Sequence, residues 1–350
     1  MNTLRACVVI AAFFFFLSSP AFGMETSTQE KSWTFSFYFE NDLFTGSDQN
    51  YTNGVKLSWM SPDLRTYEES GSLPEFTLPA VRFLPFVNEP ESIQRNISLA
   101  IGQSMYTPEE ISRSDLIIDD RPYAGWTYLA IGFHSRSVSK QDSLEFQMGL
   151  VGPESFAEQA QTIVHEIGGY QKPNGWDNQL KNEPGLEVIY ERKVRLWRHE
   201  YSGGFGSDLI AHLGGALGNV YTYGNAGMVG RIGWNIPLDF GTALIRPAGD
   251  TNAPLGGSDP RFSSIRKLSL HLFAGVDVKG VLRDIFLDGN TFTDSHSVDK
   301  KNLVADFVTG ISFILWKMKF SLSHVLRTKE FCGQKQNHQR FGSVNLSFSY

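Results

Sequence analysis

His165 stands in a stretch of the sequence whose residue types could support acid–base chemistry. Gly152-Pro153 precedes the stretch and Gly168-Gly169 follows it, and this punctuation is typical of a helix. Between them, one polar flank repeats at spacings of three and four, formed by Glu158, Gln161, Thr162 and His165. A neutral imidazole can accept a proton from water near pH 7, which makes His165 a candidate general base. The alternative is a surface histidine without a chemical role.

The same predicted helix carries an apolar stripe beside the polar flank, formed by Phe156, Ala160, Ile163, Val164 and Ile167. Such a stripe must cover something apolar, which could be the rim of the fold, a lipid surface or an acyl chain. We expect it to dock on the rim. Docking in this way would bring Gln161 and His165 over the polar cluster of the first hairpin.

This polar cluster lies between Phe39 and Gly54. Its carboxylate, carboxamide and hydroxyl groups fall close together in the chain, at Asn41, Asp42, Asp48, Asn50, Thr52 and Asn53. Hard cations and polarised carbonyl groups favour such oxygen-rich clusters. Asn and Asp are also ordinary turn residues, so a hydrophilic loop without a ligand is an equally good interpretation of the loop alone.

Arg121 and Tyr123 are the candidates for substrate binding. They lie in the run Asp119-Asp120-Arg121-Pro122-Tyr123-Ala124-Gly125-Trp126. A guanidinium can hold a phosphate or a sugar, whereas the simpler interpretation is a salt-bridged turn followed by interfacial aromatic residues. The next loop, 173–181, contains Trp176 and is expected to pack and to help shape the site. The sequence contains no Gly-x-Ser-x-Gly elbow, phosphate loop, zinc pattern or nucleotide fingerprint.

The elements that must position these residues are strands. Trp33, Phe35, Phe37 and Phe39 alternate with polar residues, and Val55, Leu57 and Trp59 do the same after the polar cluster. This period of two predicts a hairpin with one apolar face, which we expect to face lipid. The pattern recurs near 97–101, 125–137, 143–150, 186–191, 204–213, 217–233, 268–272, 306–313, 318–323 and 343–350. Twelve such segments predict an outer-membrane β-barrel, although a soluble sandwich shows the same period.

The connections between these strands support closure into a barrel. With the first strand starting in the periplasm, the outer connections are 42–52, 105–124, 151–184, 214–216, 280–301 and 328–340. Most are long and polar, as outer loops should be. Two inner connections, 61–95 and 237–264, are unexpectedly long, and each is expected to hold a small helix or a partly ordered loop.

Composition agrees with an exported barrel. The 350 residues carry only 19% charged side chains and 13% aromatic ones, and the net charge of −6 gives no support to nucleic-acid binding. Residues 1–23 read as a secretory signal, with Arg5, an apolar run and Ala21-Phe22-Gly23 before the cleavage point. Residues 24–350 then form one domain. Cys7 leaves with the signal, so Cys332 alone can form no internal disulfide.

Five motifs in this order resemble the lipid A 3′-O-deacylase family of Gram-negative outer-membrane β-barrels, which includes uncharacterised relatives. The motifs are Asn41-Asp42, Tyr51-Thr52-x-Gly54, Asp119 to Trp126, Gly152-Pro153 followed by Gln161-x-x-x-His165, and Trp176-Asp177-Asn178-Gln179-Leu180. The resemblance covers essentially the whole mature chain. It implies a twelve-stranded antiparallel transmembrane barrel with a short helix in an extracellular loop, located in the outer membrane.

The resemblance also implies an activity, a cofactor and a set of site residues. The family hydrolyses the 3′-linked acyl ester of lipid A with calcium, using a histidine-activated water and a metal-stabilised oxyanion. Carried over by position, His165 would be the general base, and Asn41, Asp42 and Thr52 would complete the catalytic site. Asp42 and Asn41 would hold the Ca²⁺. The partners would be lipopolysaccharide and the outer membrane.

Other functions remain open on the sequence alone. The chain could be a pore whose loop acids set ion preference, or a binding or adhesin barrel that uses its long outer loops. A serine phospholipase barrel is a weaker alternative, because no suitable Ser, His and Asn spacing stands out. The sequence does not fix which acyl chain leaves, the oligomeric state or the full set of metal ligands.

Overall fold

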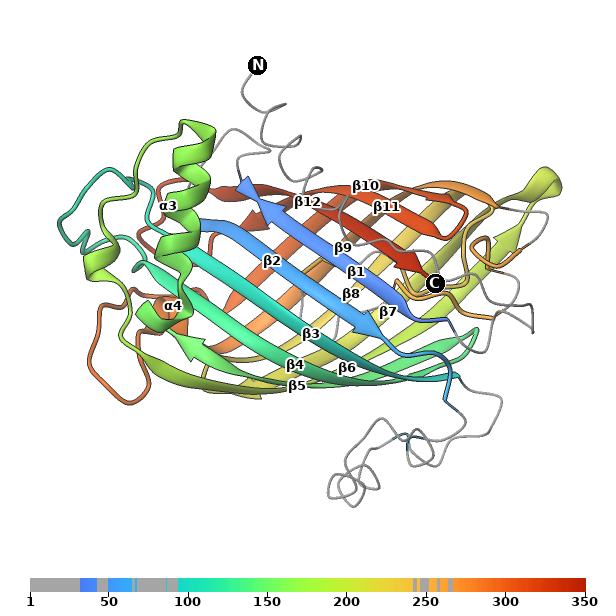
Figure 1. The fold of residues 1–350 in the computed structure, drawn as a ribbon, viewed down its shortest axis with the longest axis horizontal. Helices are drawn as coiled ribbons and strands as arrows, with labels where there is room; N and C mark the ends of the chain where they lie inside the picture. The colour runs from blue at the N-terminus through green and yellow to red at the C-terminus, as the bar shows by residue number, and fades with distance from the viewer. Residues whose placement is uncertain are drawn as a thin grey trace.

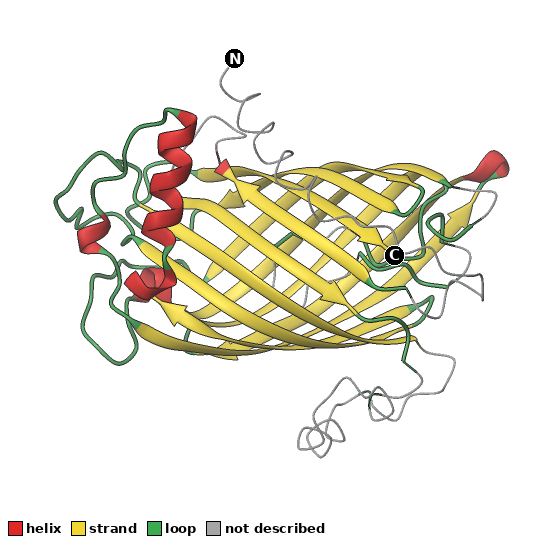
Figure 2. Cartoon of the chain, viewed as in Figure 1, coloured by secondary structure: helices red, strands yellow, loops and turns green. Residues whose placement is uncertain are grey.

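The fold is an antiparallel β-barrel, seen in a computed structural model that describes residues 32–42, 50–64, 67, 86, 94–241, 244–245, 252–256, 259–263 and 267–350. The predicted signal, 1–23, lies outside the described residues. The strands are β1 (Thr34–Asn41), β2 (Asn50–Met60), β3 (Gln94–Thr107), β4 (Ala124–Arg136), β5 (Lys140–Val151), β6 (Glu183–Glu200), β7 (Phe205–Gly218), β8 (Tyr221–Trp234), β9 (Leu268–Asp284), β10 (Leu303–Leu315), β11 (Met318–Thr328) and β12 (His338–Ser349). Each strand pairs with its sequence neighbours, and β1 pairs with β12, so the sheet closes on itself (Figures 1 and 2). Closure leaves no unpaired sheet edge, as a lipid environment requires.

The two faces of the wall differ as the alternation predicts. Along β1, Thr34, Ser36, Tyr38 and Glu40 are buried toward the lumen, while Phe35, Phe37 and Phe39 lie on the other face. Leucines on the outer face of neighbouring strands are well exposed, for example Leu129 at 58%. An apolar outer face and a polar interior are the pattern of a membrane barrel. The prediction for this strand is therefore confirmed.

Two short helices belong to the end of the barrel that we call the outer end, because the long polar connections predicted to face outward meet there (Figures 1 and 2). They are α3 (Ala157–Gly168) and α4 (Ile285–Asp288). The predicted helix between Gly152 and Gly169 is thus confirmed as α3, preceded by a 3-10 turn at Pro153–Ser155. None of the described helices is long and apolar enough to cross a membrane.

The predicted connection at 214–216 is wrong. β7 continues to Gly218, and the turn to β8 falls at residues 219–220. Glycines suggested a loop, but Gly214 pairs with Asn225 inside the sheet. A β-carbon on Gly214 would lie 2.6 Å from the Tyr190 carbonyl oxygen, so the small residue serves close strand approach rather than a turn.

The long inner connection between β8 and β9 also differs from the expectation of a small periplasmic helix or a partly ordered loop. Its described residues fold into the lumen, where they meet side chains from strands around the barrel. Asn252 donates to Tyr38 Oη on β1 at 3.0 Å and to Asn345 on β12 at 2.9 Å, and Arg136 on β4 donates to the Ala253 carbonyl at 2.9 Å. We call residues 236–263 the lumen segment. Of the other long connection, 61–95, most lies outside the described residues.

Buried ion pairs fix the lumen segment in place. Its Asp239 lies 2.6 Å from Arg231 on β8 and 2.7 Å from Lys319 on β11, and all three side chains are fully buried. Its Arg261 pairs with Asp259 at 2.8 Å and reaches Asp239 at 3.4 Å. Charges in a low-dielectric interior are stable only when paired in this way. Described residues of the lumen segment therefore occupy part of the lumen.

Candidate active site

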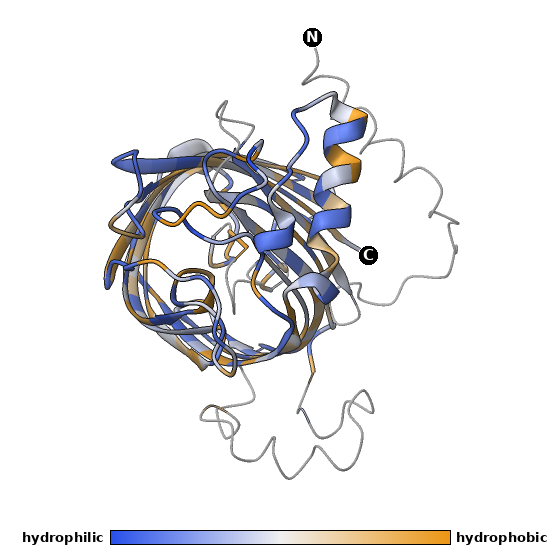
Figure 3. Ribbon diagram, turned by 90° about the vertical axis from the view of Figure 1, so that its left-hand side faces the viewer, coloured by the Kyte–Doolittle hydropathy of each residue, from blue (hydrophilic) through white to orange (hydrophobic). Residues whose placement is uncertain are grey.

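α3 lies outside the barrel wall and crosses the outer ends of β4 and β3 towards β2 (Figures 1 and 3). Its start is held by the wall. Gln103 on β3 and Thr127 on β4 both donate to the Ser155 carbonyl oxygen, each at 2.7 Å. Both donors lie on the outer face of their strands, one alternation step from the exposed Ile101 and Leu129. The 3-10 turn before α3 is therefore bonded directly to the outside of the barrel.

Gly125 allows this close approach. A β-carbon at Gly125 would lie 2.1 Å from Ser155 Oγ and 2.3 Å from Ala157 Cβ, which is closer than atoms can pack. Beyond this contact, Ala157 packs in one buried cluster with Met105, Tyr123 and Trp176. The first turn of α3 thus rests on the wall at a position that only glycine permits.

The side of α3 that faces the protein is the reverse of the expected one. Ala157, Gln161 and His165, spaced by four residues, are buried, whereas the stripe is exposed except for Ala160, which packs against the buried cluster. Ile163 is 55% exposed and Ile167 is 63% exposed. Docking of the stripe on the rim was therefore a wrong prediction. The stripe shares its outward orientation with the lipid-facing leucines of the wall, and the polar flank is enclosed.

His165 is held in one orientation by the chain that follows α3. Gly169 adopts a left-handed conformation with φ of 67°, which turns the chain back so that the Tyr170 amide donates to the His165 carbonyl at 2.9 Å. The Gln171 carbonyl then lies 2.5 Å from His165 Nδ1. A carbonyl oxygen can only accept, so Nδ1 carries the proton of the neutral ring. Nε2 is left as a proton acceptor.

Gln161 lies one turn before His165 on the same buried side. Its Oε1 accepts a hydrogen bond of 2.8 Å from Trp176 Nε1, which fixes the orientation of the amide. Its Nε2 has no hydrogen-bond partner within the described part of the chain. Trp176 is buried against Tyr123, with ring centroids 5.0 Å apart. The prediction that the Trp176 loop packs is thus confirmed, and its role in shaping the site stays a prediction. The bond from Trp176 to Gln161 was not predicted.

Asn41, Asn53 and Met105 lie side by side in one row on the outer face of the wall. We call it the polar row, after its two asparagines. Asn41 pairs with Asn53 across β1 and β2, Asn53 pairs with Met105 on β3, and Met105 pairs with Gly125 under α3. The outer-face residues Phe35, Phe37 and Phe39 of the same strand are half-buried, whereas Asn41 is only 5% exposed and Asp42, which follows it, is fully buried. Something covers this row.

We infer that the His165 side of α3 covers it. Ala157 lies over β4, and His165 follows eight residues later, about 12 Å along the helix. Neighbouring strands are about 4.8 Å apart, so this distance carries the helix across β3 to the ends of β2 and β1. His165 is itself only 4% exposed. On this inference His165, Asn41 and Asp42 would share one region between α3 and the wall, and their grouping in one site stays a prediction.

Thr52 belongs to the same region by its backbone. The pairing of β2 with β3 shifts between Tyr51 and Asn53, which leaves Thr52 in a bulge one position beyond Asn53. Bulges commonly re-aim a side chain next to a site. The Thr52 side chain is not among the described atoms, so its catalytic role stays a prediction.

Arg121 and Tyr123 lie elsewhere. Arg121 is fully buried, 3.3 Å from Glu330 and 4.9 Å from the ring of Tyr106. Tyr123 is buried under α3 and donates to the Ile111 carbonyl at 3.1 Å. Both positions are those of packing residues. Their assignment to substrate binding stays a prediction to which this geometry adds no support.

The oxygen donors of the region fit a hard cation in type. Asp42 offers a carboxylate, and Asn41 and Asn53 offer amide oxygens, which suit Ca²⁺ better than Zn²⁺. Across the described ranges, no group of three or more His, Cys, Asp or Glu residues could hold a metal ion. Any calcium there would need amide or backbone oxygens beside Asp42.

Comparison with known proteins matches residues 8–350 to the family described as "Outer membrane protein LpxR". Among solved structures, the chain is similar to LpxR from Salmonella typhimurium, with a TM-score of 0.68, 18% sequence identity, and coverage of 90% of this chain and 99% of that one. The β domain of the Bordetella autotransporter BrkA gives a TM-score of only 0.40 at 7% identity, covering 91% of this chain and 98% of that one. No curated protein matches in sequence.

Proposed function

Because the chain belongs to the LpxR family of outer-membrane proteins, which act on lipid A, we propose that it hydrolyses the 3′-linked acyl ester of lipid A. The observation that carries this proposal is the orientation of His165. Its Nδ1–H donates to the Gln171 carbonyl, so in the neutral ring Nε2 is the nitrogen that would accept a proton. This is the arrangement that a general base requires.

In the proposed reaction, water is the nucleophile. His165 Nε2 takes one proton from the water while the water oxygen attacks the ester carbonyl carbon. This attack gives a tetrahedral oxyanion. The bond from that carbon to the sugar oxygen then breaks, and the imidazolium returns the proton to the sugar oxygen. The products are a free fatty acid and a lipid A hydroxyl group.

The negative charge of the oxyanion would be stabilised by groups on α3 and on the barrel wall. Gln161 Nε2, which lacks a partner in the part of the chain that is described, can donate to the substrate carbonyl oxygen. Asp42 and Asn41 would hold Ca²⁺, with Thr52 in support. When bound, the cation would supply Lewis-acid stabilisation of the developing negative charge.

The position of the site suits a membrane lipid. It lies on the outside of the wall at the outer end, and the apolar stripe of α3 faces the same surroundings as the lipid-facing leucines. A lipid in the outer leaflet could therefore approach sideways without entering the barrel. The alternative function of a pore is disfavoured by the lumen segment, whose Asp239 is bonded inside the barrel to Arg231 on β8 and to Lys319 on β11.

The direct test is turnover by the purified, refolded protein. We expect lipid A in mixed micelles with calcium to lose the mass of one 3′-linked acyl group, detected by mass spectrometry, with release of the corresponding fatty acid. A heat-shift gel on the same sample reports whether the barrel is folded. Intact lipid A after incubation with a folded barrel and calcium would exclude the proposed activity.

A further inference from the structure

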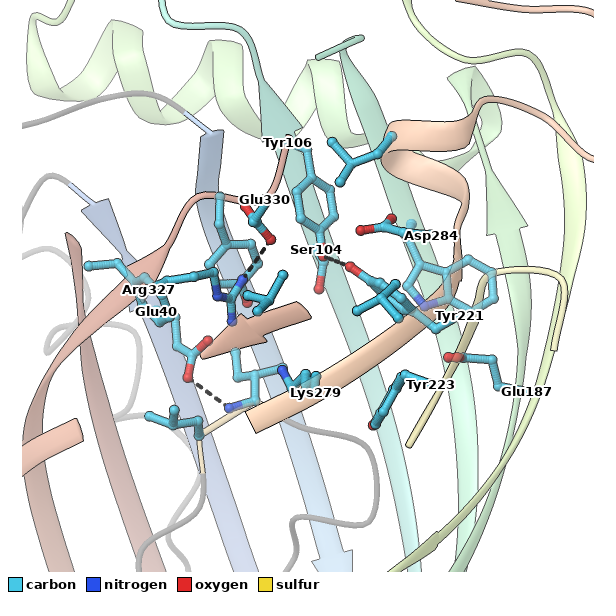
Figure 4. Close-up of a pocket in the computed structure, with 18 of the residues that line it drawn as sticks. Glu40, Ser104, Tyr106, Glu187, Tyr221, Tyr223, Lys279, Asp284, Arg327 and Glu330 are labelled. Carbon is cyan, nitrogen blue, oxygen red and sulfur yellow. Dashed lines mark hydrogen bonds and ion pairs between the residues drawn. The ribbon is translucent and has the colours of Figure 1, made fainter. Parts of the chain in front are cut away.

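A cavity that is separate from the candidate active site lies inside the barrel, toward its outer end (Figure 4). Its volume is about 100 Å³, and every strand except β7 contributes at least one residue to its lining. Leu244 and Ile245 of the lumen segment line it, and so do Leu287 of α4 and Lys301 of the connection that follows. It is therefore enclosed by wall, lumen segment and outer connections.

The lining combines aromatic rings with carboxylates. The aromatic residues are Tyr51, Tyr106, Trp126, Tyr128, Tyr221, Tyr223 and Phe341, and the acidic ones are Glu40, Glu187, Asp284 and Glu330. The rings contact one another. The ring centroids of Tyr106 and Phe286 are 4.1 Å apart in a stacked arrangement, and the hydroxyl oxygens of Tyr106 and Tyr221 are 3.0 Å apart. Such a wall is preformed and requires little ordering when a ligand binds.

The cationic groups near the cavity are mostly engaged. Lys279 lies 3.4 Å from Asp306, and Arg327 binds both oxygens of Asp306 at 2.7 and 3.0 Å. Glu330 is shared by Arg327 at 3.2 Å and Arg121 at 3.3 Å. Counting the lining residues and their ion-pair partners gives six carboxylates against four cations. The carboxylates are Glu40, Glu187, Asp277, Asp284, Asp306 and Glu330, and the cations are Arg121, Lys279, Lys301 and Arg327. Among the described residues, the lining thus has more carboxyl groups than cationic groups.

Glu187 on β6 is the group that points to a ligand. Its side chain is only 3% exposed, it lines the cavity, and its Oε1 has no hydrogen-bond partner among the residues described. Burying a carboxylate oxygen without a hydrogen-bond donor raises the free energy of the folded state unless a ligand or water supplies the donor. Figure 4 shows Glu187 on the same wall of the cavity as Tyr223 and Tyr221.

Two stacked rings lie beside Glu187. Trp126 and Tyr128 are 5.6 Å apart at an angle of 20°, and the Trp126 ring packs over Gly185, two residues before Glu187 on the same face of β6. A β-carbon at Gly185 would lie 2.4 Å from the Trp126 ring, so glycine is what lets the ring approach β6. Aromatic faces beside a carboxylate are the surroundings that bind ammonium groups.

We propose that this lumenal cavity binds a small organic ammonium ion, with Glu187 accepting its hydrogen bonds and Trp126 and Tyr128 covering its hydrocarbon part. Asp284 is a second acid in the lining, which favours a diamine over a monoamine. The same walls already attract the cations of the protein itself, since Lys279 lies 5.8 Å from the Tyr223 ring centre and Arg327 lies 5.3 Å from that of Phe341. This site goes beyond the proposed deacylation and is independent of it.

The test is calorimetric titration of the full, detergent-solubilised barrel with putrescine at low salt. We expect saturable binding by the wild type, and binding at least tenfold weaker by Glu187→Gln. Glu191→Gln is the matched control, because Glu191 lies on β6 but outside the cavity, paired with Lys193 at 3.2 Å, and it should bind as the wild type does. The neutral analogue 1,4-butanediol should not bind.

Two results would overturn the proposal. One is the absence of saturable putrescine binding by a wild-type barrel that a heat-shift gel shows to be folded. The other is a folded Glu187→Gln protein with unchanged affinity, which would place any binding elsewhere on the molecule. Equal binding of putrescine and 1,4-butanediol would show that the ammonium charge is not recognised. This result would also overturn the proposal.

Discussion

His165 shows how a single hydrogen bond can define a catalytic role. Its Nδ1 is bonded to the Gln171 carbonyl, and this bond exists because Gly169 reverses the chain at the end of α3. Sequence spacing suggested the histidine, but not the carbonyl that sets its tautomer. Nothing in the residue types at 170 and 171 marks them, since the contribution of Gln171 is its backbone.

We expect His165→Ala to lower the rate of lipid A deacylation by roughly 10²- to 10⁴-fold, the usual contribution of a general base. The barrel should remain folded because α3 lies outside the strand network. Mass spectrometry of lipid A, run beside a heat-shift gel, measures both. A folded variant with a rate within a few-fold of the wild type would remove His165 from the mechanism.

Asp42 is the residue on which calcium dependence should rest. It is fully buried and directly follows Asn41, and its carboxylate is the only one among Asn41, Asp42, Thr52 and Asn53. We expect a chelator to abolish deacylation and Asp42→Ala to abolish it or to require far more calcium. Titration of the rate against free calcium distinguishes these cases. Full activity of the wild type in excess chelator would contradict the metal's role.

At the scale of elements, the strands were predictable and the placement of α3 was not. Alternation at 33–39 and 55–59 predicted β1, β2 and their lipid-facing sides, because a strand with one buried face records its orientation in every second residue. The same pattern failed at Gly214 and Gly215, where small residues conceal the period.

The helix itself was also predictable, but the side it buries was not. The general rule that an apolar stripe seeks the protein assumes that water surrounds the fold. Lipid reverses that assumption, so Ile163 and Ile167 face outward and Gln161 is enclosed. Gln103 and Thr127, which hold the start of α3, carried no signal of their own in the sequence.

Gly125→Ala tests whether the seating of α3 controls the site. The new methyl group would overlap Ser155 and Ala157 and displace the helix from the wall. We expect the deacylation rate to fall by about 10²-fold, since a misplacement near 1 Å can have that effect. Gly230→Ala on β8 is the control, because the nearest atom to its added β-carbon is 3.9 Å away. Equal activity of both variants would show that α3 tolerates the shift.

At the scale of the whole molecule, the lumen segment cross-links strands of the barrel from the inside. Arg231 and Lys319, on strands far apart in the sequence, converge on the Asp239 carboxylate and hold its pKa well below the ordinary value, against the opposing effect of burial. Alternation predicted polar lumen-facing residues. It could not predict that a connection would enter the lumen to meet them, because that depends on contacts between distant strands.

The depressed pKa of Asp239 makes stability depend on pH. A carboxyl whose pKa is lowered by folding stabilises the protein fully above its unfolded pKa of about 3.9, and that contribution is lost as the pH falls through the folded value. We expect Asp239→Asn to lower the free energy of unfolding by about 3 to 5 kcal/mol at pH 7, as loss of one partner of a buried pair does. Urea unfolding between pH 7 and pH 2 measures this. The variant should lack the acid-dependent loss that Asp239 causes, and an unchanged profile would contradict its role.

The lumen segment also predicts that the barrel does not conduct ions. In planar bilayers the wild type should show no steady conductance, whereas Asp239→Asn, which loosens the segment, should show intermittent openings. Steady, porin-like currents from the wild type would restore the pore interpretation of the long outer loops.

The outward-facing stripe of α3 has a consequence for kinetics. If Ile163 and Ile167 rest among acyl chains, the region around His165 meets its ester in two dimensions, within the plane of the leaflet. The rate would then follow the mole fraction of lipid A in the membrane rather than its bulk concentration. Diluting the substrate with inert phospholipid at constant total lipid A would slow turnover, whereas diluting the whole vesicle suspension with buffer would not.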